Sequence, residues 1–282
     1  MEIKKVGVVG CGIMGRGIVE VSAKAGFDVI VSEINQELLD KGIAGINASL
    51  TKAVEKGKVT EADKAATIGR IKGTTDTGSF KDCDLVIEAA IENLEVKKKV
   101  FIDLDKVCSK HAVLATNTSC LSVTDLAAVT QRPDKVVGMH FFNPVSAMKL
   151  LELVKTIVVS DETIKAAESF GASIGKTAII APDIPGFIVN RVHAPYMLEC
   201  IKLLEAGMAT KEDIDRGMTL GYGFPMGPFA LADMVGLDTI YFLCEAMYDE
   251  LKDPKFTPPL LLKKMVTAGH LGRKTGKGFY DY

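Results

Sequence analysis

The 282-residue sequence predicts an α/β fold in which a doubly wound, mostly parallel sheet is followed by a smaller all-α domain. Three observations predict this fold class. Short β-branched runs alternate with helical patterns in the first half of the chain, a glycine-rich turn follows the first run, and the pattern is helical after residue 187. We expect the first domain to span residues 1–184 and the second to span residues 185–282.

The expected strands are aliphatic runs without polar alternation, which is typical of strands covered on both faces of a parallel sheet. They lie at residues 4–10, 28–33, 84–90, 112–117 and 136–142, with two further runs at 150–156 and 177–183. A helical insertion at about residues 36–70 separates the second run from the third. Its first helix should start after Asn35, with Leu39, Ile43, Ile46, Leu50 and Val54 on its buried face.

Composition excludes several classes of function. The net charge of −2 provides no general attraction for nucleic acid or for an anionic membrane. No apolar run approaches the roughly 18 residues that span a bilayer. The six cysteines form no CxxC pair and no metal-ligand spacing, so we expect reduced thiols and no metal site. The first strand starts close to residue 3, which leaves no room for a signal peptide and favours a cytoplasmic protein.

A glycine-rich turn follows the first expected strand and opens a helix. Its residues are Gly10, Cys11, Gly12, Ile13, Met14 and Gly15. Gly10 would permit the tight turn, Gly12 the close approach of a pyrophosphate, and Gly15 the packing of the helix on the sheet. Glu33 ends the second strand at close to the ~20-residue spacing of a ribose-binding carboxylate. The alternative is a structural turn that binds nothing.

These features together predict a Rossmann-type, dinucleotide-binding sheet. The loop residues, Ile13 and Met14 included, should contact the cofactor. A carboxylate at position 33 would repel a ribose phosphate, so NAD is favoured over NADP.

A histidine and a glutamate occupy symmetric positions in two apolar arms. His140 and Glu152 are equally distant from residue 146, in the middle of the connection that starts at Asn143-Pro144. A symmetric antiparallel hairpin would place the two side chains next to each other. A neutral histidine can accept the proton of an alcohol during oxidation, and a neighbouring carboxylate would fix its tautomer. The alternative is a core histidine whose carboxylate partner is purely structural.

Polar residues also follow several other expected strands. Glu92, Asn117, Ser119, His140 and Asn143 all fall near carboxyl ends of strands, where open α/β sheets bind their ligands. We therefore expect them to line one cleft. Ser119 could form a hydrogen bond with the oxygen of a substrate.

Motifs over the whole chain resemble the L-3-hydroxyacyl-CoA dehydrogenase family, in particular the short bacterial 3-hydroxybutyryl-CoA dehydrogenases. They are GCGIMGRGI, EAAIENLEVKK, TNTSCLS, HFFNPV, the glutamate of LLELV, PGFIVNR, GFPMGPFALADMVGLD and GRKTGKGFY. The resemblance implies reversible hydride transfer between NAD(H) and the pair (S)-3-hydroxybutyryl-CoA and acetoacetyl-CoA. It also implies a homodimer that forms through the helical domain.

The resemblance also implies roles for individual residues. His140 would be the general base and Glu152 its partner, while Ser119 and Asn190 would hold the oxygen functions of the substrate. The residues expected around the cofactor are Ala89, Glu92, Lys97, Asn117 and Asn143. Lys52 and Lys56, one helical turn apart, could bind the phosphates of CoA; alternatively they are solvated cations near the end of a helix.

Three alternative functions remain open at this point. The substrate could be a longer 3-hydroxyacyl-CoA, or a free 3-hydroxy acid, although dehydrogenases of free acids more often use a lysine as the acid-base group. The chain could also bind a dinucleotide without turnover. The set of Ser119, His140, Glu152 and Asn190 argues against a binding protein that is not an enzyme.

Overall fold

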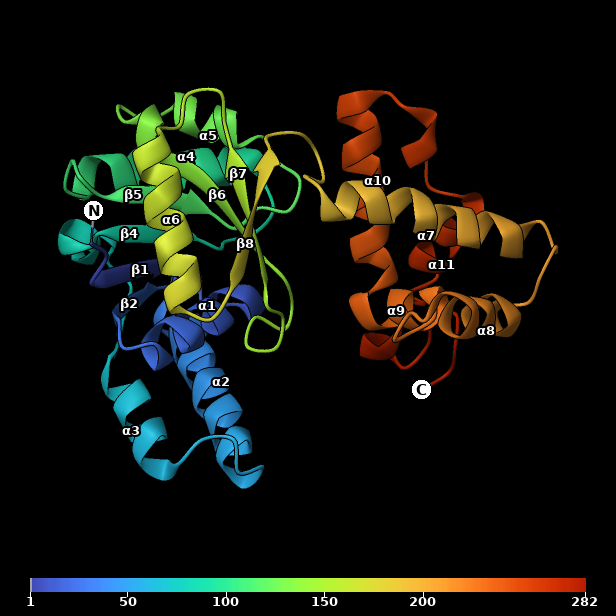
Figure 1. Ribbon diagram of the computed structural model, residues 1–282, viewed down its shortest axis with the longest axis horizontal. Coiled ribbons are helices and arrows are strands. Elements are labelled where there is room, and N and C mark those ends of the chain that lie inside the picture. The colour runs from blue at the N-terminus through green and yellow to red at the C-terminus, as the bar shows by residue number, and fades with distance from the viewer. Residues whose placement is uncertain (1) are drawn as a thin grey trace. The chain divides into compact units, whose positions relative to one another are not determined.

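The computed structural model describes residues 2–282 and contains two compact units. The first unit ends at Asp183 and is built from a sheet with helices on both faces, whereas the second, Ile184–Tyr282, is helical (Figure 1). The α/β fold with a helical C-terminal part is therefore as the sequence predicts. No helix within residues 2–282 is both long and apolar enough to cross a membrane.

The sheet of the first unit has eight strands in the order β3-β2-β1-β4-β5-β6-β7-β8. All neighbouring strands are parallel except β6 and β7, which form an antiparallel hairpin. The strands are β1 (Lys5–Val9), β2 (Asp28–Ser32), β3 (Ile71–Thr74), β4 (Leu85–Glu88), β5 (Val113–Thr116), β6 (Val136–Phe141), β7 (Leu150–Lys155) and β8 (Thr177–Pro182).

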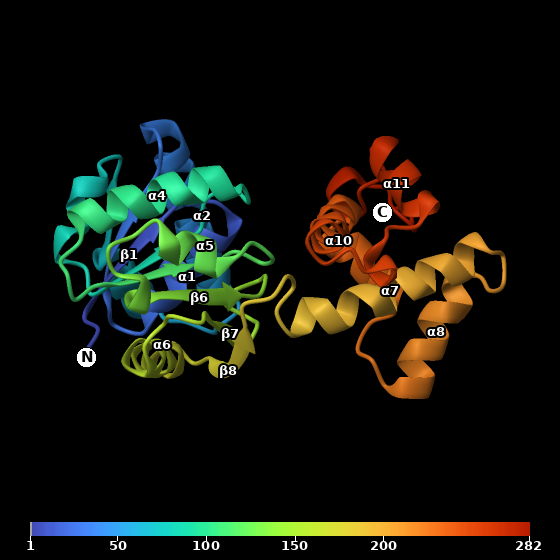
Figure 2. The ribbon, with the colours of Figure 1, turned by 90° about the horizontal axis from the view of Figure 1, so that it is seen from above.

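Helices cover both faces of this sheet, which explains why its central strands are aliphatic throughout. The helices are α1 (Ile13–Lys24), α2 (Gln36–Glu55), α3 (Glu61–Gly69), α4 (Leu94–Val107), α5 (Val123–Ala128) and α6 (Asp161–Ser173). Helices α4 and α5 lie on one face and α6 on the other (Figure 2). Phe27, which follows α1, packs against Phe170 of α6 with ring centroids 5.2 Å apart. Side chains such as Val8 and Ile87 are consequently fully buried.

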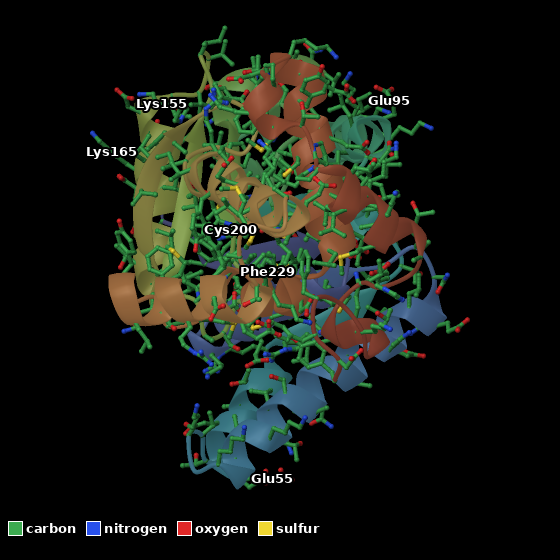
Figure 3. All side chains as sticks on the ribbon, turned by 90° about the vertical axis from the view of Figure 1, so that its right-hand side faces the viewer. Glu55, Glu95, Lys155, Lys165, Cys200 and Phe229 are labelled. Atoms are coloured by element: carbon green, nitrogen blue, oxygen red, sulfur yellow. The ribbon has the colours of Figure 1, made fainter. Side chains whose placement is uncertain are left out.

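The helical insertion forms the α2–α3 hairpin. Asn35 caps α2, because its side-chain oxygen accepts a hydrogen bond from the Leu38 amide at 2.9 Å. Glu55 ends the helix far from the sheet (Figure 3), and Gly57 follows in a left-handed conformation with φ of 65°. The start of this helix and its buried Leu39, Ile46 and Leu50 confirm the sequence prediction. Ile43 and Val54, expected on the same face, are only partly buried.

Strand β3 was not predicted from the sequence. Its four residues, IKGT, contain a single aliphatic side chain, and both Lys72 and Gly73 are exposed. The strand lies at the edge of the sheet beside β2, so it buries too little to require an apolar run.

The second unit contains five α-helices. They are α7 (Val189–Glu205), α8 (Lys211–Tyr222), α9 (Pro228–Val235), α10 (Leu237–Leu251) and α11 (Leu260–Thr267). Its own apolar core includes Cys200 and Phe229, both labelled in Figure 3. The buried Asp233 fastens the C-terminal segment to α9, because its carboxylate accepts hydrogen bonds from the Phe279 and Tyr280 amides at 2.8 Å.

Candidate functional site

The β6–β7 hairpin brings the histidine and the glutamate together. In the antiparallel register His140 lies directly opposite Glu152, as the symmetric spacing predicts. Side chains at directly opposed positions point to the same face of a sheet. His140 Nδ1 and Glu152 Oε2 are 2.7 Å apart.

This pair is buried, with His140 at 5% exposure and Glu152 at 0%. An ionised carboxylate can only accept, so a neutral His140 must donate from Nδ1 and keep its basic lone pair on Nε2. The ring of Phe142 packs against the imidazole with centroids 4.5 Å apart. The arrangement fixes the tautomer of a histidine that can act as a base.

The glycine loop lies at the same edge of the sheet, between the end of β1 and the start of α1. Gly10 has φ of +94°, and a Cβ at this position would lie 2.7 Å from the carbonyl oxygen of Ala89. A Cβ on Gly15 would lie 1.9 Å from the Gly10 carbonyl oxygen, so only glycine lets the helix start this close to the loop. A Cβ on Gly12 would meet no described atom within 4 Å. The loop is therefore tight against the protein on two sides and open at Gly12, which fits a bound pyrophosphate.

Glu33 follows β2 and binds this loop directly. Its Oε1 accepts a hydrogen bond from the Cys11 amide at 2.6 Å, and its Oε2 accepts one from the Ile34 amide at 3.2 Å. The carboxylate is thus held beside the glycine loop, where a ribose hydroxyl would be recognised in a dinucleotide-binding sheet.

A buried ionic network lies next to the carboxyl end of β4. Lys97 Nζ contacts Glu88 Oε1 at 2.7 Å and Glu92 Oε2 at 3.3 Å, although Lys97 is only 1% exposed. Glu88 is fully buried and also accepts hydrogen bonds from the Ala90 amide and from Thr116 Oγ1, each at 2.7 Å. The ammonium of Lys97 is therefore held between two carboxylates. Sequence reasoning missed Glu88, since it reads as an ordinary residue within a strand.

The network continues to Ser119 through Glu92. Oε1 of Glu92 accepts hydrogen bonds from Thr118 Oγ1 at 2.6 Å, from the Ser119 amide at 2.8 Å and from Ser119 Oγ at 3.1 Å. Burial alone would raise the pKa of Glu92, but the charge of Lys97 and these hydrogen bonds outweigh it, and the pKa is lowered. Glu92 is therefore ionised at neutral pH and orients the Ser119 hydroxyl.

Asn117 joins the ends of two neighbouring strands. Its Oδ1 accepts a hydrogen bond from the Phe141 amide at 2.9 Å, which joins the end of β5 to the end of β6 next to His140. The cofactor contact predicted for Asn117 stays a prediction.

Two thiols lie close to these residues. Burial and then the charge of Glu92 raise the pKa of the Cys120 thiol to about 12. Burial and then the charge of Glu33 raise the pKa of Cys11 to about 11. Both thiols are protonated at neutral pH and are poor nucleophiles. This excludes them as activated catalytic cysteines.

The two lysines of α2 differ in position. Lys52 lines a cavity of about 390 Å³ together with Ser49 of the same helix and with Asn143 and Ser146 of the β6–β7 connection. Lys56 caps the C-terminus of α2. Among residues 2–282, the lining of this cavity does not include Lys56. Ser49 was not identified from the sequence, because the sequence does not indicate whether a serine on a helix faces a cavity or solvent.

Asn190 belongs to the second unit, where it lies in the first turn of α7 and is half-buried. Its expected role beside His140 stays a prediction. The other candidate residues belong to the first unit, in which the carboxyl ends of β1, β2, β4, β5 and β6 share one edge of the sheet.

Comparison with known protein families identifies two consecutive matches. The model described as "3-hydroxyacyl-CoA dehydrogenase, NAD binding domain" matches residues 5–184, and the one described as "3-hydroxyacyl-CoA dehydrogenase, C-terminal domain" matches residues 186–282. The two matches cover both the sheet and the helical unit.

Several relatives are similar over their whole length. The 3-hydroxybutyryl-CoA dehydrogenase of Mycobacterium tuberculosis is 45% identical over 282 residues, which is 99% of each chain. That of Clostridioides difficile is 45% identical over 278 residues and 99% of each chain. Among solved structures, (S)-3-hydroxybutyryl-CoA dehydrogenase PaaH1 from Ralstonia eutropha has a TM-score of 0.95 at 46% identity. The match covers 100% of this chain and 99% of the PaaH1 chain. M. tuberculosis FadB2 has a TM-score of 0.98 at 45% identity, with both chains fully covered.

The resemblance seen in the sequence motifs is thus confirmed by matches that extend over both units. The chain belongs to the 3-hydroxyacyl-CoA dehydrogenase family.

Proposed function

We propose that this chain is an (S)-3-hydroxybutyryl-CoA dehydrogenase that interconverts (S)-3-hydroxybutyryl-CoA and acetoacetyl-CoA with NAD(H). The observation that carries the proposal is the buried His140–Glu152 pair, 2.7 Å apart, at the sheet edge that also bears the glycine loop. Relatives with this activity in their names, at about 45% identity over the whole chain, support the same reaction.

The residues at the loop fit a dinucleotide. Gly10, Gly12 and Gly15 would hold the pyrophosphate at the N-terminus of α1, and the Glu33 carboxylate would accept hydrogen bonds from the adenosine ribose. A carboxylate beside the loop disfavours a phosphorylated ribose, which supports NAD over NADP. When bound, the nicotinamide supplies the acceptor or donor of the hydride at carbon 3 of the substrate.

His140 moves the proton in this mechanism. In the oxidative direction Nε2 takes the proton of the 3-hydroxyl group, and in the reductive direction it returns that proton to the oxygen. Glu152 accepts a hydrogen bond from Nδ1 in both states and compensates the positive charge that His140 carries after taking the proton. The burial of the pair limits the access of water to the imidazole.

Other residues would orient the reactants. Ser119, whose hydroxyl is oriented by Glu92, and Asn190 would hold the oxygen functions of the substrate near His140. Ala89, Glu92, Lys97, Asn117 and Asn143 would surround the nicotinamide half of the cofactor. Of these, Lys97 would act through the carboxylates that hold it.

Lys52 would bind a phosphate of CoA, because it lines a cavity at the β6–β7 connection. We expect Lys52→Ala to raise the KM for acetoacetyl-CoA about tenfold, the effect of one lost charged contact. Lys56 would bind the same phosphates from one helical turn further along α2, so Lys56→Ala should raise the KM as well. Lys41→Ala, at an exposed position of the same helix, is the matched control, and an equal effect on KM for Lys41→Ala would contradict the assignment.

A homodimer through the helical unit and a cytoplasmic location complete the proposal. Large apolar side chains of this unit, such as Leu220, Tyr222 and Phe242, are exposed on the single chain, which supports a partner surface. The six cysteines form no disulfide within residues 2–282, and this supports a reducing compartment. A monomeric mass by light scattering in dilute solution would contradict the dimer.

The test of the proposed function follows NADH absorbance with acetoacetyl-CoA, in parallel with free acetoacetate and with NADPH. Rapid oxidation of NADH with the thioester alone is the expected result. Turnover of the free acid at a similar kcat/KM would instead favour a dehydrogenase of 3-hydroxy acids. If the protein bound NADH without turning over either substrate, it would be a binding protein. A lower KM for longer 3-oxoacyl-CoAs would redirect the assignment to a longer acyl chain.

A further inference from the structure

Glu20 is a buried carboxylate to which the mechanism assigns no role. It lies on the third turn of α1 and is 5% exposed. Other buried charged residues, among them Glu88, Lys97, Arg132 and Asp233, have hydrogen-bonding or ionic partners. The structure gives the Glu20 side chain no hydrogen bond and no ion pair with any of residues 2–282.

Glu20 instead lines the cavity of about 390 Å³ that also contains Lys52. Arg16, one helical turn earlier on α1, lines it as well, and Asn143 to Ser146 form another part of its wall. Arg16 reaches α2 at Gly45, where a Cβ would lie only 2.8 Å from the guanidinium Nη1. Two cations, one carboxylate and the apolar side chains of Ile13 and Val145 therefore face one space.

The Glu20 carboxylate keeps contact with the water of the cavity. Among residues 2–282, the fully buried side-chain polar atoms that lack a hydrogen-bond partner are Arg191 Nη1 and Tyr196 OH, and the Glu20 oxygens are not among them. A hydrated carboxylate that no protein group holds can exchange its water for a ligand. Arg16 is placed at the i, i+4 spacing at which opposite charges pair on a helix, yet the two side chains form no ion pair. A carboxylate that remains available inside a cavity is suited to accept hydrogen bonds from a ligand.

We propose that Glu20 is a specificity-determining residue that accepts a hydrogen bond from an N–H or O–H group of the pantetheine arm of the thioester substrate. This inference rests on the proposed function. The arm carries amide N–H groups and a hydroxyl group next to phosphates. The cavity offers the complementary set, with an acceptor on Glu20, positive charge on Arg16 and Lys52, and apolar walls. Through Glu20 the enzyme distinguishes the arm itself from any other phosphorylated chain.

The experiment compares Glu20→Leu and Glu20→Gln with the unaltered enzyme. Lys24→Gln, one turn further along α1 and exposed, is the control for a changed charge on the same helix. The measurements are the Kd of CoA and of NADH by calorimetry, the KM and kcat for acetoacetyl-CoA and acetoacetyl-pantetheine, and the midpoint of thermal unfolding without ligand. The pantetheine thioester lacks the nucleotide phosphates, so it isolates the contact with the arm.

Glu20→Leu should raise the Kd of CoA and the KM of both thioesters about ten- to a hundredfold, the effect of a lost hydrogen bond to a charged group. Glu20→Gln should have a smaller effect, since its amide oxygen still accepts. The effect should fall on KM rather than on kcat, with the Kd of NADH and the Lys24→Gln variant unaffected. The unfolding midpoint of Glu20→Leu should not fall, because the carboxylate forms no hydrogen bond or ion pair that holds the fold.

Unchanged or tighter binding of both thioesters by Glu20→Leu would overturn the inference. A lower unfolding midpoint in both Glu20 variants would also overturn it, because the carboxylate would then stabilise the fold. If the Glu20→Leu variant does not fold, the same comparison with Glu20→Gln decides. Failure of the proposed function would differ visibly: the unaltered protein would neither turn over acetoacetyl-CoA nor bind CoA, and both proposals would fall.

Discussion

Replacing Lys97 with methionine tests the buried network next to the carboxyl end of β4. The ammonium lies 2.7 Å from Glu88, and the two residues are 1% and 0% exposed. Methionine matches the length of lysine and removes the charge, so the variant leaves Glu88 buried without its cation. Removing one partner of a buried ion pair costs about 3–5 kcal/mol. Because Glu88 keeps its hydrogen bonds from the Ala90 amide and Thr116, we expect a loss of about 3 kcal/mol.

The next residue provides a matched control. Lys98, whose side chain is 25% exposed, pairs with Glu95 at 3.2 Å and lies 3.8 Å from Asp125, and a solvent-accessible pair of this kind contributes at most about 1 kcal/mol. Free energies of unfolding from urea denaturation at pH 7, followed by circular dichroism, should therefore separate Lys97→Met from Lys98→Met by about 2 kcal/mol. The double variant Glu88→Gln with Lys97→Met should recover part of the loss, because neither charge remains. Equal losses for the two single variants, or additive losses in the double variant, would refute the reasoning.

The remaining predictions concern the thiols. Burial and the charge of Glu92 raise the pKa of Cys120 to about 12. Iodoacetamide at pH 8 should therefore alkylate Cys120 at least ~10²-fold more slowly than a free thiol, as measured by mass spectrometry of the native protein. Labelling of Cys120 at the rate of a free thiol would contradict this. Burial raises the pKa of Cys83 and Cys244 to about 12 from an ordinary value of 9.0, so their thiols ionise first in the unfolded chain. The contribution of these two thiols to the free energy of unfolding should thus be constant below about pH 9 and fall as the pH rises toward 12. Urea denaturation at pH 8 and pH 10 checks the sign, and equal or greater stability at pH 10 would show it to be wrong.

The sequence was most informative where geometry follows from local periodicity. Opposed positions in a symmetric hairpin are set by counting residues from the turn, which is why the contact between His140 and Glu152 could be predicted. The position of Glu33 beside the glycine loop agrees with its spacing from that loop in the sequence, because neighbouring parallel strands end at the same edge of the sheet. In each case the prediction needed only the strand period and the direction of the chain.

Contacts between distant segments could not be predicted in this way. Glu88 and Lys97 each lie in an ordinary strand or helix pattern, and only the packing of α4 on the sheet brings them together. The orientation of Glu20 and Ser49 toward one cavity likewise depends on how α1 and α2 pack. Strand β3 was missed because an edge strand buries too little to leave an aliphatic signature.

The central claim is that His140 transfers the proton of the reaction. The measurement that tests it most directly is the turnover of acetoacetyl-CoA by His140→Gln at saturating NADH, with the Kd of NADH determined on the same protein. We predict that kcat falls about 10²- to 10⁴-fold, the contribution of a positioned acid-base group, while NADH binding is retained. Near-native turnover in a variant that still binds NADH would contradict the mechanism.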